Sequence, residues 1–240
     1  MRLLVVPFAA DATDTEAHDL AAYLAGETAA ELSEARLLVD VVPITRKGLG
    51  KAAARLGVET ALGAKLRVEG GKVHVDALLV DAGGAERASW SESLPLGAAL
   101  RIPAMLARAA LLALGEDASA AAESVQPEAP AEAMLRFCRA AAAGDVDELL
   151  ALALEVPLFE PPRRALLRAA EEAVGGDRMP ACLAALEQLA EARPEDAEVL
   201  LALGEYRALH FDASARKPAV SRSAQPAAGS TPSPSTRSCA

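Results

Sequence analysis

The chain has few cysteines and few aromatic residues. Its 240 residues include three cysteines (Cys138, Cys182 and Cys239), an odd and widely spaced set that excludes a disulfide framework and favours a reducing cytosol. Aromatic residues make up 3% of the chain although apolar residues make up 52%, so most of the apolar content is Ala and Leu. This composition predicts a core built from helix contacts between small side chains.

Net positive charge and long apolar runs are also missing. The 24 Lys and Arg face 34 Asp and Glu, a formal net charge of −10, and an acidic surface repels nucleic acids and anionic membranes. No apolar run approaches the roughly 20 residues that a membrane-spanning helix needs. The apolar run at the amino terminus is broken by Pro7 and followed by acids, so we interpret it as a buried first strand rather than a cleaved signal.

Motifs of catalysis and metal binding are absent from the sequence. There is no CxxC, GxSxG or Walker pattern, and His18, His74 and His210 have no acidic or thiol partner at ligand spacing. Cys138 and Cys182 fit small packing positions on helices. We therefore predict a protein that is not an enzyme, with no catalytic, cofactor-binding or metal-binding residue.

One segment resembles a nucleotide-binding motif. Gly48-Leu-Gly50-Lys-Ala-Ala53 reads as G-x-G-x-x-A, in which bare glycine backbone would bring a pyrophosphate to a helix N-terminus. Pro43 separates the motif from the preceding strand, the helix is short, and an antiparallel meander follows where a parallel crossover is required. We interpret the motif as a turn and helix cap, and nucleotide binding or enzymatic activity through Gly48–Ala53 stays an alternative.

The first 114 residues predict an α+β domain with the order βαβαβββα, a mixed sheet containing an antiparallel meander and flanked by helices. Positions 60–68 and 73–79 alternate apolar and polar residues around Gly70-Gly71, which is a strong hairpin signal. The remaining expected elements are strands at 3–8, 37–42 and 86–93, and helices at 14–35, 50–56 and 100–114.

The rest of the chain predicts a different architecture. Residues 115–130 read as a linker rich in Ala, Ser, Glu and Pro. Residues 131–212 predict an all-α domain of helical hairpins, with helices at 131–143, 146–156, 162–174, 180–192 and 195–211. The tail 213–240 has four basic residues, no acids and many Ser, Pro and Ala, so we predict that it is disordered.

Several segments carry a family resemblance. LLVVPFAA from Leu3, Arg46-Lys47-Gly48, the AAARLG segment ending at Gly57, and Trp90-Ser91-Glu92 resemble motifs of the TolB amino-terminal-like domain, over about residues 2–114. That domain occurs in bacterial regulators and in proteins linked to cyclases or kinases. The chain departs from the family after Phe8, where the usual Asn-containing stretch is missing.

The helical part resembles degenerate tetratricopeptide repeats. Cys182, Leu186, Leu189 and Pro194 match the second helix of a repeat, and Leu203-Gly204 with Tyr206 is similar to the start of the next repeat, its Tyr one residue early. The resemblance implies a concave groove that holds a peptide or a partner helix. Acidic residues of these helices form solvated faces or, alternatively, line a groove that selects a basic ligand.

These observations favour a protein that acts by binding. We predict a non-enzymatic, cytoplasmic interaction or scaffold protein of bacterial signalling or transcriptional regulation, with a protein or peptide partner. Lys65, Arg67 and Trp90, expected near one another on neighbouring strands, and Tyr206 with Arg207 in the repeat groove, are the candidate partner-binding residues. The alternative to docking at Trp90 is core filling beside a solvated face. A further functional alternative is an accessory protein of the cell envelope.

Overall fold

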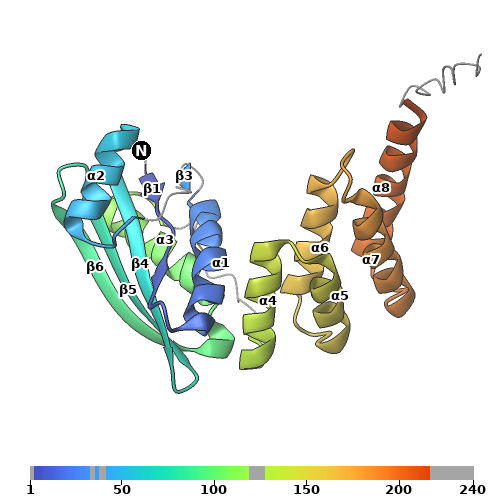
Figure 1. The fold of residues 1–240 in the computed structure, drawn as a ribbon, viewed down its shortest axis with the longest axis horizontal. Helices are drawn as coiled ribbons and strands as arrows, with labels where there is room; N and C mark the ends of the chain where they lie inside the picture. Colours follow the sequence, from blue (N-terminus) through green and yellow to red (C-terminus); the bar gives the residue numbers. More distant parts are fainter. Residues whose placement is uncertain (1–2, 33–35, 38–41, 119–127, 217–240) are drawn as a thin grey trace, which may run out of the picture.

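The computed structural model describes residues 3–32, 36–37, 42–118 and 128–216 (Figure 1). A mixed sheet with flanking helices forms the amino-terminal part, and a row of helices forms the carboxyl-terminal part. The strands are β1 (Leu3–Val5), β2 (Ala9–Ala10), β3 (Arg36–Leu37), β4 (Thr60–Glu69), β5 (Lys72–Asp81) and β6 (Glu86–Pro95). The α-helices are α1 (Thr15–Glu31), α2 (Arg46–Leu56), α3 (Arg101–Leu114), α4 (Ala131–Ala143), α5 (Val146–Glu155), α6 (Pro161–Glu172), α7 (Met179–Ala192) and α8 (Ala197–Arg216), with a short 3-10 helix at Leu96–Ala98.

The sheet has the predicted mixed topology. Its main path runs β3-β1-β4-β5-β6, and β2 pairs with β4 beside β1. The strand β1 is parallel to both β3 and β4, while β4, β5 and β6 form an antiparallel meander. All three residues of β1 are buried, as expected for a parallel strand covered on both faces.

The hairpin between β4 and β5 follows from two glycines. Glu69 pairs with Lys72, so Gly70 and Gly71 form the two-residue turn between them. Their φ angles are 58° and 74°, a region that favours glycine and suits the twist of a hairpin. The predicted hairpin is therefore confirmed at this turn.

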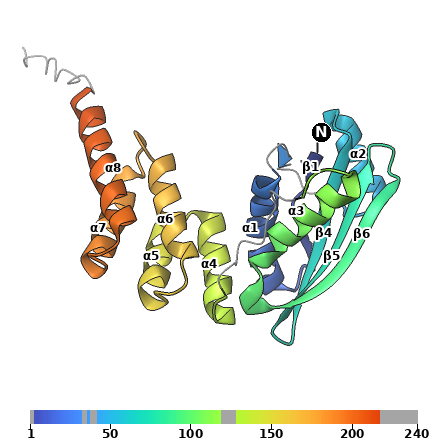
Figure 2. The same cartoon turned by 180° about the vertical axis from the view of Figure 1, so that it is seen from behind.

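Helices cover the two faces of the sheet unequally. Figures 1 and 2 show α1 and α3 on one face and α2 on the other. The face toward α1 and α3 buries every second residue of β4 and β5 in the larger core, whereas α2 covers a smaller core at one end of the opposite face. The larger core includes Leu20, Leu24, Leu62, Leu66, Ile102 and Leu106; the smaller includes Leu4, Leu49, Ala53, Ala61 and Val80.

The helix predicted at 50–56 begins earlier, at Arg46. The hydroxyl of Thr45 accepts a hydrogen bond from the backbone N–H of Gly48 at 3.1 Å, which caps the first turn. Gly57, with φ of 64°, ends the helix as predicted. Gly48 and Gly50 therefore lie inside α2. Neighbouring backbone leaves no room for a side chain at these positions, and a Cβ on Gly50 would meet Gly84.

Other predicted boundaries also shift. The first strand ends at Val5 and pairing resumes in β2, because Pro7 has no N–H to donate within a continuous strand. Helix α1 ends at Glu31, whereas the predicted helix ran to residue 35; residues 33–35 lie outside the described residues. Residues 38–41 of the strand predicted at 37–42 also lie outside them. The third meander strand and α3 lie where the sequence predicts them.

The described carboxyl-terminal helices pack in sequence order. Each of α4 to α8 contacts the next, and α4 with α6, α5 with α7, and α6 with α8 also touch. Their identity as tetratricopeptide repeats stays a prediction. Helix α8 continues to Arg216, past the predicted boundary at 212, because Ala-rich sequence favours helix; residues 217–240 of the predicted tail lie outside the described residues.

The two parts share one buried cluster. Helix α1 packs on α4, and the larger core continues through this contact from the sheet into α4–α8. The end of the predicted linker is also attached: the N–H of Ala129 donates to the carbonyl of Gly97 at 3.1 Å, and Glu128 pairs with Arg101. The division into domains at 1–114 and 131–212 stays a prediction. Across the described residues, no helix has the length and apolarity to cross a membrane.

Candidate functional site: a cleft between α1 and α6

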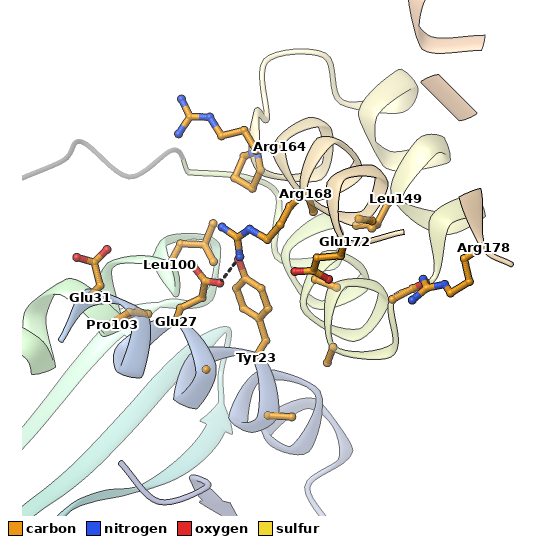
Figure 3. Close-up of a pocket in the computed structure, with 18 residues that line it drawn as sticks. Tyr23, Glu27, Glu31, Leu100, Pro103, Leu149, Arg164, Arg168, Glu172 and Arg178 are labelled. Carbon is orange, nitrogen blue, oxygen red and sulfur yellow. Dashed lines mark hydrogen bonds and ion pairs between the residues drawn. The ribbon is translucent and has the colours of Figure 1, made fainter. Parts of the chain in front are cut away.

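A cleft of about 550 Å³ lies where the two parts of the chain meet (Figure 3). Helix α1 forms one wall, α6 forms another, and the end of α4 contributes to the floor. Small side chains keep the cleft open, among them Ala22, Gly26, Ala141, Ala142, Ala165 and Ala169. Six charged residues also line it: Glu27, Glu31, Arg164, Arg168, Glu172 and Arg178.

Three aromatic rings connect α1 to the helical part beneath the cleft. The rings of Tyr23 and Phe137 meet edge to face with centroids 5.0 Å apart, and Phe137 meets Phe159 in the same manner at 5.5 Å. Both phenylalanines are fully buried. Burial of Tyr23 raises the pKa of its hydroxyl well above its ordinary value, so it stays neutral and can only donate or accept hydrogen bonds.

Ion pairs cross between the two parts. A guanidinium nitrogen of Arg168 on α6 lies 3.1 Å from a carboxylate oxygen of Glu27 on α1, as drawn in Figure 3. This hydrogen bond and the charge of Glu27 raise the pKa of Arg168. Below the cleft, Nε of Arg139 on α4 donates to Asp19 on α1 at 2.9 Å. These pairs join α1 to α4 and to α6 at the surface, where exposed ion pairs add little to stability.

Charges at the rim remain available. Arg164 and Glu31 are exposed and form no ion pair with any other described residue. Arg178 donates to the carbonyl of Gly144 at 2.5 Å, a contact that leaves its positive charge without a carboxylate. Guanidinium groups recognise carboxylates through two parallel hydrogen bonds, so the rim can hold a charged ligand without losing an internal pair.

The described residues do not assemble a reactive group. They contain no cluster of three or more His, Cys, Asp or Glu that could hold a metal ion. Cys138 and Cys182 are buried, as predicted for packing residues, and burial raises the pKa of both thiols. A thiol with a raised pKa is a weak nucleophile at neutral pH.

The sequence contained a signal for this cleft that was missed. Tyr23, Glu27 and Glu31 recur every four residues on α1, and Arg164, Arg168 and Glu172 do so on α6. Residues at this spacing lie on one helix face, so each helix carries a polar stripe. That the two stripes face one cleft depends on how α1 packs against the helical part.

The three predicted partner-binding residues of the sheet lie on β4 and β6, and Lys65 and Trp90 line one surface depression. Strand β5 lies between β4 and β6, so Lys65 and Trp90 are not on neighbouring strands as predicted. Lys65 pairs in register with Asp76, which pairs with Ser91, whereas Trp90 pairs with Ala77. Consecutive residues of a strand face opposite sides of the sheet, so Trp90 faces away from the side of Ser91 and Lys65. The half-buried Trp90 packs on the larger core, consistent with its core-filling alternative.

Lys65 and Arg67 lie on the opposite, polar face of the sheet. Nζ of Lys65 is 2.7 Å from Asp11, and Arg67 is 3.9 Å from Asp76. The hydrogen bond and charge of Lys65 lower the pKa of Asp11. Both cations are thus engaged in exposed pairs, and their role in partner binding stays a prediction.

The two predicted residues of α8 lie outside the cleft. Tyr206 packs at the edge of the larger core, and burial raises the pKa of its hydroxyl. Nε of Arg207 donates to Glu187 on α7 at 3.1 Å. Neither residue lines the cleft between α1 and α6.

Comparison with known proteins adds little to this geometry. No protein-family model matches the chain, and no curated protein matches it in sequence. Among solved structures, the chain resembles TolB from Acinetobacter baumannii with a TM-score of 0.37 and 13% identity, over 47% of this chain. The match spans 28% of that TolB chain. A likeness at this TM-score carries no argument about the chain.

Proposed function

We propose that the chain is a non-enzymatic interaction protein of the bacterial cytoplasm that binds a protein or peptide partner in signalling or transcriptional regulation. The observation that supports binding is the cleft between α1 and α6, whose rim presents Arg164 and Glu31 outside any described ion pair. Repeats of stacked helices commonly use such concave surfaces for partners.

The composition of the cleft suits a peptide segment. Its small residues leave room for a main chain, and Tyr23, Leu100 and Pro103 offer apolar contact. Aromatic and arginine side chains are the usual anchors of protein interfaces. The available charges of both signs would then select the side chains that the segment carries.

Site-specific photo-crosslinking tests this proposal. A benzophenone amino acid at Ala142, an exposed residue of the cleft, is expected to give one discrete adduct in native lysate. The same amino acid at Ala184, exposed on α7 and outside the cleft, serves as the control. Arg164→Glu in the Ala142 protein should remove the adduct. Equal labelling at both positions, or an adduct that survives Arg164→Glu, would contradict binding in the cleft.

A further inference from the structure

Strand β6 is the last strand of the described sheet, so one row of its backbone groups faces no other described strand. The register with β5 shows which residues own these groups. At the end of the ladder, the N–H of Leu96 donates to the carbonyl of Gly71 at 2.9 Å. Because hydrogen-bonded and non-hydrogen-bonded pairs alternate along an antiparallel ladder, every second residue counted back from Leu96 bonds to β5. The backbone groups of Ser89, Ser91 and Ser93 therefore point outward, to the open edge.

The features that protect a sheet edge lie only at the two ends of β6. Proteins commonly block an open edge with proline, a bulge or charged side chains. A bulge leaves Arg87 outside the register with β5, and Pro95 ends the strand. Residues 88–94 lie between them and include one charged residue, Glu92, and no proline. These residues, which we call the open segment, are centred on Ser91.

The backbone of the open segment is complementary to a second copy of itself. If two β6 strands pair antiparallel about a two-fold axis at Ser91, Ser91 meets its own copy and Ser89 meets Ser93 of the other chain. These are the residues whose backbone groups point outward, so each such pair exchanges two hydrogen bonds. An axis at any other residue of the open segment places Arg87 or Pro95 opposite one of the serines. The symmetric pairing at Ser91 thus uses the whole open segment.

The side chains of the open segment also fit this pairing. On one face of the sheet the three serines meet only serines, which are small and uncharged. On the other face Ala88 meets Leu94 of the second copy, and Trp90 meets Glu92, so no charge lies directly opposite a like charge. Trp90 and Leu94 are half-buried at the margin of the larger core. A second copy would cover both residues and extend this core across the axis.

We propose that the chain forms a two-fold dimer in which β6 pairs antiparallel with β6 of a second copy, with Ser91 at the axis. Figures 1 and 2 show β6 on the side of the sheet away from α4–α8, so the second copy leaves the cleft between α1 and α6 open. The dimer then carries two clefts. The inference rests on β6 alone and does not require that the cleft binds anything.

Sedimentation equilibrium of the full chain over a range of concentrations tests the proposal. The mass should rise from the 24.7 kDa of one chain to twice that value as the concentration increases. Because each copy carries a net charge of −10, added NaCl should tighten the dimer by screening their repulsion. A dimer that dissociates in NaCl would depend on ion pairs and would overturn the proposal.

A proline at the axis tests the backbone pairing. Ser91→Pro removes an N–H that points outward, so the hydrogen bonds between β5 and β6 stay in place. The dimer loses the two hydrogen bonds at its axis, and the Kd for dimerisation should rise roughly 10- to 100-fold. Ser91→Ala keeps this N–H and should leave the Kd within about threefold.

A charge exchange tests the register of the two strands. Ser89→Lys with Ser93→Lys places like charges opposite each other in the dimer, whereas Ser89→Lys with Ser93→Glu places opposite charges there. The Kd of the first protein should exceed that of the second roughly tenfold at low salt. The first protein has the smaller net negative charge, so general repulsion between the copies predicts the reverse order. Equal Kd values, or the reverse order, would overturn the pairing of Ser89 with Ser93.

The remaining outcomes are also decisive. A chain that stays monomeric at every concentration would overturn the proposal, as would a dimer whose Kd is the same in Ser91→Pro and Ser91→Ala. Leu201→Glu, at a side chain of α8 that is 64% exposed, should not change the dimer. Loss of the dimer in Leu201→Glu but not in Ser91→Pro would assign the contact to α8. Far-ultraviolet circular dichroism checks that each variant is folded, and the charge exchange decides the matter if Ser91→Pro is not.

Discussion

Phe137 joins the two parts of the chain, so its truncation should destabilise both. Its ring is 1% exposed and meets Tyr23 of α1 on one side and Phe159 on the other. Replacing a buried Phe by Ala removes about 3–5 kcal/mol of unfolding free energy, through lost burial and the cavity left behind. Each edge-to-face contact contributes about 0.5–1.5 kcal/mol beyond burial, so the loss should lie in the upper half of that range.

Two spectroscopic signals can follow the consequence of Phe137→Ala separately. Trp90 is the only tryptophan of the chain and lies on β6, so its fluorescence reports the sheet. Circular dichroism at 222 nm reports mainly the helices. Because the larger core is continuous between sheet and helices, both signals should change in one urea transition, and Phe137→Ala should shift both to lower urea.

The matched control is Leu158→Ala, at a side chain that is 92% exposed. It should change the unfolding free energy by less than about 0.5 kcal/mol. If Phe137→Ala shifted the circular dichroism transition and left the Trp90 transition unmoved, the contact between α1 and α4 would not couple the two parts. Separate transitions in the unchanged protein would refute the reasoning at once.

Three further predictions concern single positions. Gly26→Ala, in an open position of α1, should stabilise the protein by about 0.5–1 kcal/mol, whereas Gly50→Ala should lower the melting temperature because its Cβ would lie 2.7 Å from the backbone of Gly84. Lys65→Gln should raise the lowered pKa of Asp11 toward its ordinary value, as measured by NMR titration. Because the folded protein lowers this pKa, Asp11 contributes to stability above the ordinary pKa of Asp. That contribution is lost as the pH falls through the lowered pKa. An unchanged titration of Asp11 in Lys65→Gln would contradict the pairing.

The fold could be predicted where local chemistry decides structure. Alternation around Gly70-Gly71 predicts the hairpin because only glycine adopts the turn readily, and Gly57 and Gly144 end helices for the same reason. The start of α2 was misjudged because Gly48 and Gly50 read as a turn. Inside the folded protein, the backbone of Pro43 and Gly84 packs against them, and that contact is not local.

The candidate sites were less predictable. Lys65 and Trp90 were expected on neighbouring strands, but β5 lies between them, a consequence of strand order that composition does not contain. The cleft was missed because its stripes, at Tyr23 on α1 and at Arg164 on α6, are far apart in sequence.

The sequence alone thus determined the kind of elements, the hairpin turn, the acidic surface and the absence of recognisable catalytic motifs. These properties depend on residue type and near neighbours, and the scarcity of aromatic residues correctly indicated a core of mainly Ala and Leu. Only the tertiary structure decided that α1 packs on α4, that an ion pair joins α1 to α6, and that a cleft opens there. These features depend on contacts between distant segments, which local sequence does not specify.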